Sequence, residues 1–255
     1  MKHLYSSFFI IFCLSACLNL KKNIQKSDDH HKMAIGLLQQ CDHRRALSHL
    51  LKAIKLNSRD FIIRNTLAAT YYSIKEYQKA ISEYNKMLKM NPDLTEARMS
   101  LARIYIDLNQ LDKAFRQIQK SEEDITYTDR VKLMTYKALV NYKKKNYQLA
   151  KKYFNQSLSF ASGKTCFNYI YYGKTEMALD NLEESEKILK EAVLKCKKEK
   201  PLCKQAQYDE YLVLSQLYIK KEDKKRAKYY LRLFLDKIKD KKKRDQAETL
   251  LKSIS

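Results

Sequence analysis

The sequence contains very little glycine and proline, the two residues that most often build loops and linkers. It has three Gly and two Pro among 255 residues. Gly-rich phosphate loops, catalytic turns and long Pro-rich or Gly-rich linkers therefore have almost nothing to form from. The patterns G-x-x-x-x-G-K, G-x-S-x-G and H-E-x-x-H are also missing. Because these are common signatures of catalytic sites, we expect no catalytic residues, no cofactor and one continuous domain.

Small residues recur along the chain at an almost constant interval. Ala46, Ala80, Ala114, Ala150, Ser185 and Ala227 are separated by 34, 34, 36, 35 and 42 residues. A period near ~34 residues is typical of stacked helix-turn-helix repeats, in which one unit is too small to bury its own apolar face. In the clearest unit, residues 61–94, the small Ala68 and Ala80 allow two helices to approach closely and the larger Leu67 fills the space beside them. The pattern predicts an all-α fold, a tetratricopeptide-repeat superhelix of about six helix-turn-helix repeats plus a C-terminal capping helix over residues 241–254.

The N-terminus has the layout of an export signal. Lys2 precedes an apolar run over residues 4–13, and Leu14-Ser15-Ala16-Cys17 follows that run directly. The run is too short to be a transmembrane helix. The four-residue motif resembles the lipobox of bacterial lipoproteins, which implies cleavage before Cys17 and lipidation of its thiol. An ordinary secretory cleavage site with an accidental Cys is the alternative.

The lipobox divides the chain into three expected segments. These are a lipoprotein signal peptide over residues 1–16, a lipidated N-terminus and flexible tether over residues 17–29, and the repeat domain over residues 30–255. Leu18, rather than Asp, follows the lipidated Cys. The resemblance to bacterial lipoproteins then implies an outer-membrane, periplasm-facing, lipid-anchored protein.

Basic residues exceed acidic ones by a wide margin. The formal net charge is +22, from 51 Lys and Arg against 29 Asp and Glu. The basic residues are mostly Lys and occur in every repeat, which favours a solvated surface. Attraction to an anionic membrane or an acidic partner is the second interpretation. Export argues against nucleic acid, so we expect no specific nucleic-acid partner.

Four cysteines remain once Cys13 leaves with the signal peptide and Cys17 is lipidated. Cys166 opens the first helix of the fifth repeat, Cys196 closes its second helix, and Cys203 follows in the connecting segment. In an oxidising periplasm the pairings Cys166–Cys196 and Cys196–Cys203 are both conceivable, and small buried thiols are the alternative. The fourth, Cys41, is expected to stay free.

Histidines cluster in the first repeat. His30, His31, His43 and His49 accompany Cys41 there. Their spacing fits no closed zinc pattern, so we expect no metal site and interpret these histidines as solvated or half-buried.

Apolar residues on the first helix of each repeat are the expected binding surface, because the resemblance to the tetratricopeptide-repeat family implies that the first helices line a concave groove. The residues expected in this partner-binding groove are Ile35, Leu38, Ile62, Tyr72, Met99, Ile106, Leu139, Tyr142, Ile170, Met177, Leu212 and Ile219. Such a track suits a partner helix or an extended segment. The alternative is that many of these side chains pack against the adjacent repeat.

The order of a lipobox followed by six repeats resembles the type IV pilus pilotin family, the PilF/PilW/Tgl-like lipoproteins. Within residues 121–130, Asp124, Tyr127 and Arg130 resemble that family's Asp-x-x-Tyr-x-x-Arg junction, and residues 150–158 resemble its fourth repeat. The resemblance implies a non-enzymatic assembly factor that binds a secretin, or another envelope protein, through the groove. The alternative function is a general periplasmic scaffold or adaptor for another cell-envelope complex.

Overall fold

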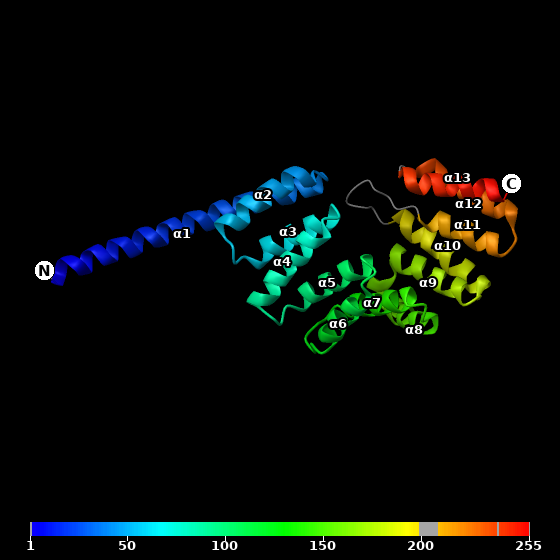
Figure 1. Cartoon of the computed structure of the whole chain (residues 1–255), viewed down its shortest axis with the longest axis horizontal. Coiled ribbons are helices and arrows are strands. Elements are labelled where there is room, and N and C mark those ends of the chain that lie inside the picture. The colour runs from blue at the N-terminus through cyan, green and yellow to red at the C-terminus, as the bar shows by residue number, and fades with distance from the viewer. Residues whose placement is uncertain (1, 199–208, 239, 255) are drawn as a thin grey trace. The chain divides into compact units, whose positions relative to one another are not determined.

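A computed structural model describes residues 2–198, 209–238 and 240–254. This part of the chain folds into thirteen α-helices and one 3-10 turn, with no strand among the residues described (Figure 1). The helices are α1 (Lys2–Gln39), α2 (His43–Leu56), α3 (Phe61–Ser73), α4 (Tyr77–Met90), α5 (Thr95–Asp107), α6 (Leu111–Glu122), α7 (Arg130–Lys143), α8 (Tyr147–Ser159), α9 (Cys166–Ala178), α10 (Leu182–Lys198), α11 (Asp209–Lys220), α12 (Lys224–Lys237) and α13 (Lys241–Ser253), with the 3-10 turn η1 (Ala161–Gly163) before α9. The predicted all-α fold is confirmed.

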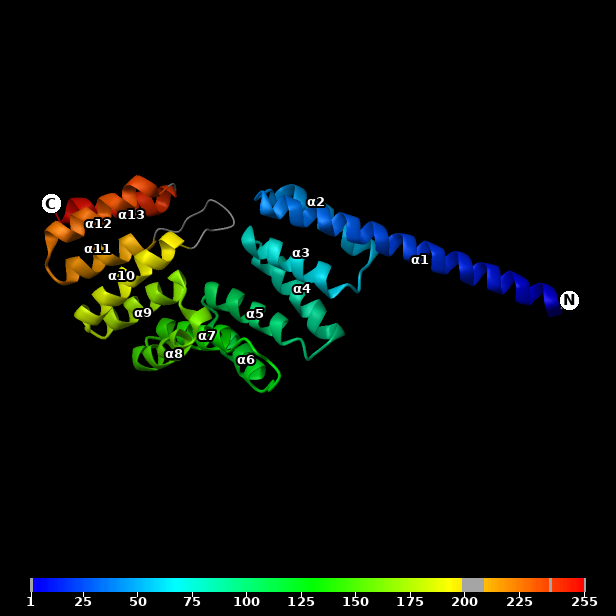
Figure 2. The same ribbon diagram turned by 180° about the vertical axis from the view of Figure 1, so that it is seen from behind.

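Consecutive helices pack as hairpins. Helix α1 lies against α2, α3 against α4, α7 against α8, α9 against α10 and α11 against α12, and the last helix, α13, covers α12. Figures 1 and 2 show the α9–α10 and α11–α12 pairs side by side from both directions. Each hairpin is one of the repeats that the spacing of small residues predicts.

The chain divides into two compact units, Met1–Ser100 and Leu101–Ser255. In the first unit Leu50, Ile63 and Leu67 are buried around Ala34 and Ala46. In the second unit a larger cluster gathers side chains of α9 to α13; its fully buried members include Leu214, Tyr218, Leu231 and Phe234. Each unit thus has an apolar core that no single hairpin could provide.

The six periodic small residues all lie on the second helix of their hairpin, and all are completely buried: Ala46, Ala80, Ala114, Ala150, Ser185 and Ala227. In the fifth repeat Ser185 lies opposite Gly173, and the Ser185 hydroxyl donates to the Gly173 carbonyl over 2.9 Å. A small side chain here allows the backbones of two helices to touch.

Every turn inside a hairpin contains one residue in the left-handed backbone region, and none of these residues is glycine. They are Cys41, Lys75, Asn109, Lys145, Asp180 and Glu222, with φ between 57° and 66°. Each stands five positions before the small residue of its repeat. The N–H of each donates to the carbonyl three residues earlier, as Lys75 does to Tyr72 over 2.9 Å. A left-handed residue followed by such bonds ends a helix and reverses the chain, although glycine would adopt this conformation more readily.

The segment expected as a flexible tether is helical instead. Residues 18–29 belong to α1, which runs without a break from Lys2 to Gln39 and extends well past α2 (Figure 1). Ser27 is completely buried, and its hydroxyl donates to the Ala53 carbonyl of α2 over 2.8 Å. This segment has neither Gly nor Pro to interrupt a helix, and its end packs against α2 at Ser27, so the expected flexible tether is helical. No helix within the residues searched is long and apolar enough to cross a membrane.

Gly173→Ala should destabilise the fifth repeat. A Cβ on Gly173 would come within 2.5 Å of the Leu189 side chain, so Leu189 or the helix that carries it would have to shift. We expect a loss of about 1–3 kcal/mol in the free energy of unfolding, measured by urea denaturation.

Gly36→Ala is the matched control, because nothing lies within 4 Å of its Cβ and it too is helical. It should stabilise the protein slightly, by about 0.5–1 kcal/mol, since Ala favours a helix more than Gly does. Equal effects of the two substitutions would contradict the close contact at Gly173.

Candidate protein-interaction surfaces

The residues expected to line the groove differ widely in exposure. Met99, Ile106, Leu139 and Ile170 are buried, with at most 6% of their surface exposed. These four are core residues, because the first helix of a repeat must also fill the space between neighbouring hairpins. Ile35 and Ile62 are exposed. The half-buried residues are Leu38, Tyr72, Tyr142, Met177, Leu212 and Ile219.

In the first unit the exposed Ile35 and Ile62 flank a contact between α1 and α3. Nε2 of His31 lies 3.0 Å from Oγ1 of Thr66. Thr66 also donates its hydroxyl to the Ile62 carbonyl over 2.9 Å, so Nε2 of His31 is the donor to Thr66. Ile35 follows His31 by one helical turn and Ile62 precedes Thr66 by one turn, so both side chains lie near this contact. With 38% and 70% of their surfaces exposed, they offer an apolar surface to a partner.

In the second unit an open depression of about 280 Å³ lies among α5, α7, η1 and α9, and we call it the aromatic pocket. Its lining residues are Arg103, Asp129, Val131, Lys132, Thr135, Tyr136, Ser162, Thr165, Phe167 and Asn168. Apolar rings and charged groups both occur in its wall, as in a site that binds a peptide side chain.

The polar residues of the aromatic pocket are firmly held. Thr135 donates to Oδ1 of Asn168 over 3.2 Å, and Nδ2 of Asn168 donates to the Gly163 carbonyl over 2.8 Å and to the Ser157 hydroxyl over 2.9 Å. Thr135 and Asn168 are both buried. Gly163 permits this arrangement, since a Cβ there would lie 1.9 Å from the Ser157 carbonyl oxygen. The pocket is therefore preorganised for binding.

A row of aromatic rings continues the wall of the aromatic pocket. The Arg103 guanidinium lies 5.0 Å from the Phe167 ring centroid, and the Phe167 ring lies 4.7 Å from that of Tyr171. Tyr171 meets Tyr142 edge-on at 5.7 Å. Burial, with the neighbouring Tyr147 and Tyr171, raises the pKa of Tyr142 above its usual range, so its hydroxyl stays neutral. Aromatic residues and Arg carry most of the binding energy at protein interfaces.

Sequence reasoning identified Tyr142 of this row and missed the others. Phe167 and Tyr171 are four residues apart on α9, which places both on one helical face. This four-residue spacing is visible in the sequence and could have identified the pair. The approach of Arg103 to Phe167 links residues that are 64 positions apart, and no local pattern marks it.

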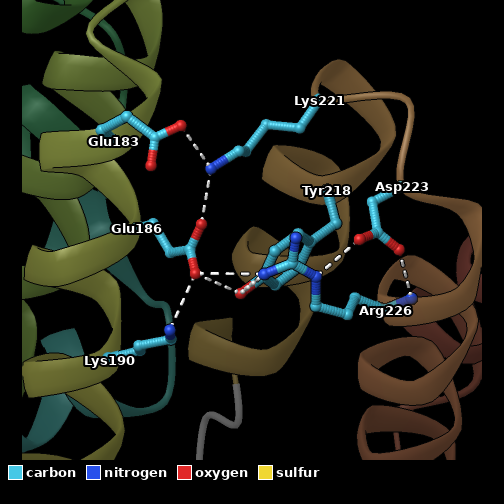
Figure 3. A network of polar contacts seen from close by, with 7 residues as sticks. All are labelled: Glu183, Glu186, Lys190, Tyr218, Lys221, Asp223 and Arg226. Carbon is cyan, nitrogen blue, oxygen red and sulfur yellow. Dashed lines mark hydrogen bonds and ion pairs between the residues drawn. The ribbon is translucent and has the colours of Figure 1, made fainter.

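A polar network joins α10, α11 and α12 around the buried carboxylate of Glu186 (Figure 3). Glu186 accepts hydrogen bonds from Tyr218 at 2.8 Å, Lys190 at 2.7 Å and Lys221 at 2.6 Å. The Arg226 guanidinium lies 4.4 Å from the Tyr218 ring centroid. The network connects the fifth repeat to the sixth, so its role is structural.

The charges of the network follow from these contacts. Burial alone would raise the pKa of Glu186, but the hydrogen bonds from Lys190, Lys221 and Tyr218 outweigh it and lower that pKa from 4.5 to about 2. Burial and the Glu186 carboxylate raise the pKa of Tyr218, so Tyr218 remains a neutral donor. Glu186 is therefore a carboxylate that accepts hydrogen bonds, and Tyr218 is a neutral phenol that donates one.

One disulfide closes the fifth repeat. Cys166 at the start of α9 is bonded to Cys196 near the end of α10, with their Cα atoms 4.8 Å apart. Cys203, the other expected partner, lies outside the described residues. A Glu210 carboxylate oxygen and the two sulfurs lie within 4.8 Å of one another, but bonded sulfurs supply no thiolates for a metal. Cys41 is also disulfide-bonded, so the expectation of a free thiol there is wrong.

Leu139→Asp and Ile62→Asp should separate core from surface. Leu139 is 2% exposed, so an unpaired carboxylate there should cost more than about 4 kcal/mol or prevent folding. Ile62 is 70% exposed in the first turn of α3, where an acidic residue is tolerated, so Ile62→Asp should change stability by less than about 0.5 kcal/mol. Thermal unfolding followed by circular dichroism measures both effects. Unfolding of the Ile62 variant would refute an exposed surface at α3.

Glu186→Gln should flatten the dependence of stability on acid pH. The lowered pKa of Glu186 stabilises the fold above pH 4.5, and that stabilisation is lost as pH falls toward about 2. Wild type should lose up to about 3 kcal/mol more than the variant between pH 5 and pH 2, in urea titrations. Glu183→Gln is the control, because Glu183 bonds the same Lys221 but is largely exposed. Parallel pH curves for wild type and Glu186→Gln would contradict this role of Glu186.

Known proteins share this architecture. Residues 31–95 and residues 75–121 each match a tetratricopeptide repeat family profile. A comparison with curated proteins found no sequence match. Among solved structures, a tetratricopeptide repeat protein from Parabacteroides merdae superposes with a TM-score of 0.70 and 16% identity, over 93% of this chain and 99% of that one.

Two further solved structures share the fold. PilW, described as a widely conserved type IV pilus biogenesis factor, superposes with a TM-score of 0.69 and 18% identity, over 82% of this chain and 92% of that one. PilF of Pseudomonas aeruginosa superposes with a TM-score of 0.66 and 15% identity, over 89% of this chain and 99% of that one. At these identities the likeness is one of fold. The chain contains tetratricopeptide repeats and has the fold of a tetratricopeptide-repeat superhelix, an architecture typical of non-enzymatic scaffolds that bind protein partners.

Proposed function

We propose that this protein is a lipid-anchored outer-membrane assembly factor, a pilotin, that binds the secretin of a type IV pilus. The observation that carries the proposal is the lipobox-like Leu14-Ser15-Ala16-Cys17 in front of a repeat fold that resembles PilW and PilF over most of both chains. The proposed function is non-enzymatic and requires no catalytic residue. Its action is affinity for a client protein at the membrane.

Two surfaces support client binding, one in each unit. The first unit offers the exposed Ile35 and Ile62, and the second offers the aromatic pocket with Arg103 and Phe167. An extended segment or a helix of the client would place apolar side chains against these surfaces. The net charge of +22 would speed the encounter with an acidic client and make it sensitive to salt.

The proposed anchor leads directly into the first repeat. Cys17 lies within the residue range of α1, and α1 packs against α2 through the buried Ser27. Each buried CH₂ of an acyl chain contributes about 0.8 kcal/mol, so the two or three chains of a bacterial lipoprotein would hold the protein stably at the bilayer. A helical connection would then limit how far the repeats move from the membrane.

Cys17→Ala should abolish anchoring and secretin assembly together. Without the thiol no diacylglycerol is attached, so the protein should leave the membrane fraction and lose incorporation of labelled palmitate. SDS-resistant secretin multimers in the outer-membrane fraction of the same cells should fall sharply while protomers persist. Cys13→Ala is the matched control, because Cys13 lies in the same N-terminal segment but outside the motif.

Other outcomes distinguish the alternatives. Loss of anchoring with unchanged multimers would support the lipoprotein but contradict the secretin as client, leaving a scaffold for another cell-envelope complex. Unchanged anchoring would refute lipidation at Cys17. Ile62→Asp, which keeps the anchor, tests the binding surface separately.

A further inference from the structure

Two histidines that are 19 residues apart meet across the first hairpin. His30 lies on α1 and His49 on α2, and their Nδ1 atoms are 3.1 Å apart. The ring centroids are separated by 5.2 Å, with the planes tilted by 58°. Both side chains are half-buried, so solvent reaches the pair. Two imidazole nitrogens that converge in this way can coordinate one metal ion together.

Although the spacing of the histidines fits no closed zinc pattern and predicted no metal site, we propose that His30 and His49 form an open binding site for a first-row divalent cation of the Zn²⁺, Ni²⁺ or Cu²⁺ class. Imidazole nitrogen suits these ions, whereas Mg²⁺ and Ca²⁺ prefer oxygen ligands. An ion about 2.0–2.1 Å from both nitrogens would see them at an angle of about 100°, close to the angles that these ions accept. Water would complete the coordination, so the site is a bidentate surface site.

The protonation of the pair is compatible with metal binding. Without an ion, one Nδ1–H donates to the other Nδ1; with an ion, both Nδ1 lone pairs bind it and that proton moves through solvent to Nε2 of the same ring. Lys52 repels a cation, but its side chain is exposed and water screens its charge. Protons compete with the cation for the imidazole nitrogens, so binding is favoured at neutral pH and opposed in acid.

The other histidines of the repeat are differently engaged. His31 contacts Thr66, and Nδ1 of His43 lies 3.2 Å from the Ser73 hydroxyl. An ion held by His30 and His49 would bridge α1 and α2, and it would therefore stabilise the hairpin, since the unfolded chain does not hold the two rings together. The site is independent of the proposed secretin function.

The test is a titration of the tag-free, full chain with ZnCl₂, followed by calorimetry and by thermal unfolding. We expect one equivalent to bind at pH 7.5, to raise the unfolding temperature, and to bind more weakly at pH 5.5 because protons compete for the imidazoles. MgCl₂ at the same concentrations should have no such effect. Absence of zinc binding, or an equal response to magnesium, would overturn the proposal.

Variants assign the site. His30→Ala and His49→Ala should each remove the zinc-dependent rise in unfolding temperature, while His43→Ala should keep it. His49→Gln retains a hydrogen-bonding group without an imidazole, so it should fold normally and still lose the zinc response. A zinc response that survives in both His30→Ala and His49→Gln would refute the pair as the ligands.

Discussion

The rest of the structure depends on the close backbone contact between the two helices of each repeat. A completely buried small residue marks this contact in every repeat, from Ala46 to Ala227. A larger side chain would crowd the facing helix, since in the fifth repeat even a Cβ on Gly173 would come within 2.5 Å of the Leu189 side chain. Because the contact recurs at similar positions, the hairpins are similar in shape and the faces they present to their neighbours match. Stacking of matched faces is what buries enough apolar surface to stabilise such small units.

The turn between the two helices of each hairpin is the second structural requirement. Each turn also fixes the position of one residue that the sequence predicts in the groove. A left-handed residue ends the first helix of each hairpin, and its N–H bonds the carbonyl three residues earlier. The carbonyls that accept these bonds belong to Leu38, Tyr72, Ile106, Tyr142, Met177 and Ile219. All six are residues that the sequence predicts in the groove, and the backbone of the turn fixes their position in each repeat. Five of the side chains are half-buried, whereas Ile106 is in the core.

The two units are built from the same kind of repeat but differ in the additional contacts that link their helices. In the second unit, the Cys166–Cys196 disulfide joins the two helices of the fifth repeat. The Glu186 network joins the fifth repeat to the sixth. A rigid frame reduces the entropy lost when a partner binds. In the first unit, the His30–His49 pair joins α1 to α2, and the continuous helix α1 contains Cys17. A cation at the histidine pair or a lipid at Cys17 would therefore act on the first hairpin. Binding surfaces on stacked repeats are consistent with a scaffold that binds protein partners.

The sequence alone determined the repeat fold, because the spacing of Ala and Ser residues reports helix contacts that recur with a nearly constant local geometry. It also marked apolar positions on the first helices, but it could not separate Ile62, which is exposed, from Leu139, which is buried. Exposure depends on what the neighbouring hairpin places opposite a side chain. It likewise failed for residues 18–29, which are helical although a flexible tether was expected there. Only the tertiary structure decided the contacts of Arg103 with Phe167 and of His30 with His49, since they join residues on different helices and no local pattern encodes the distance between them.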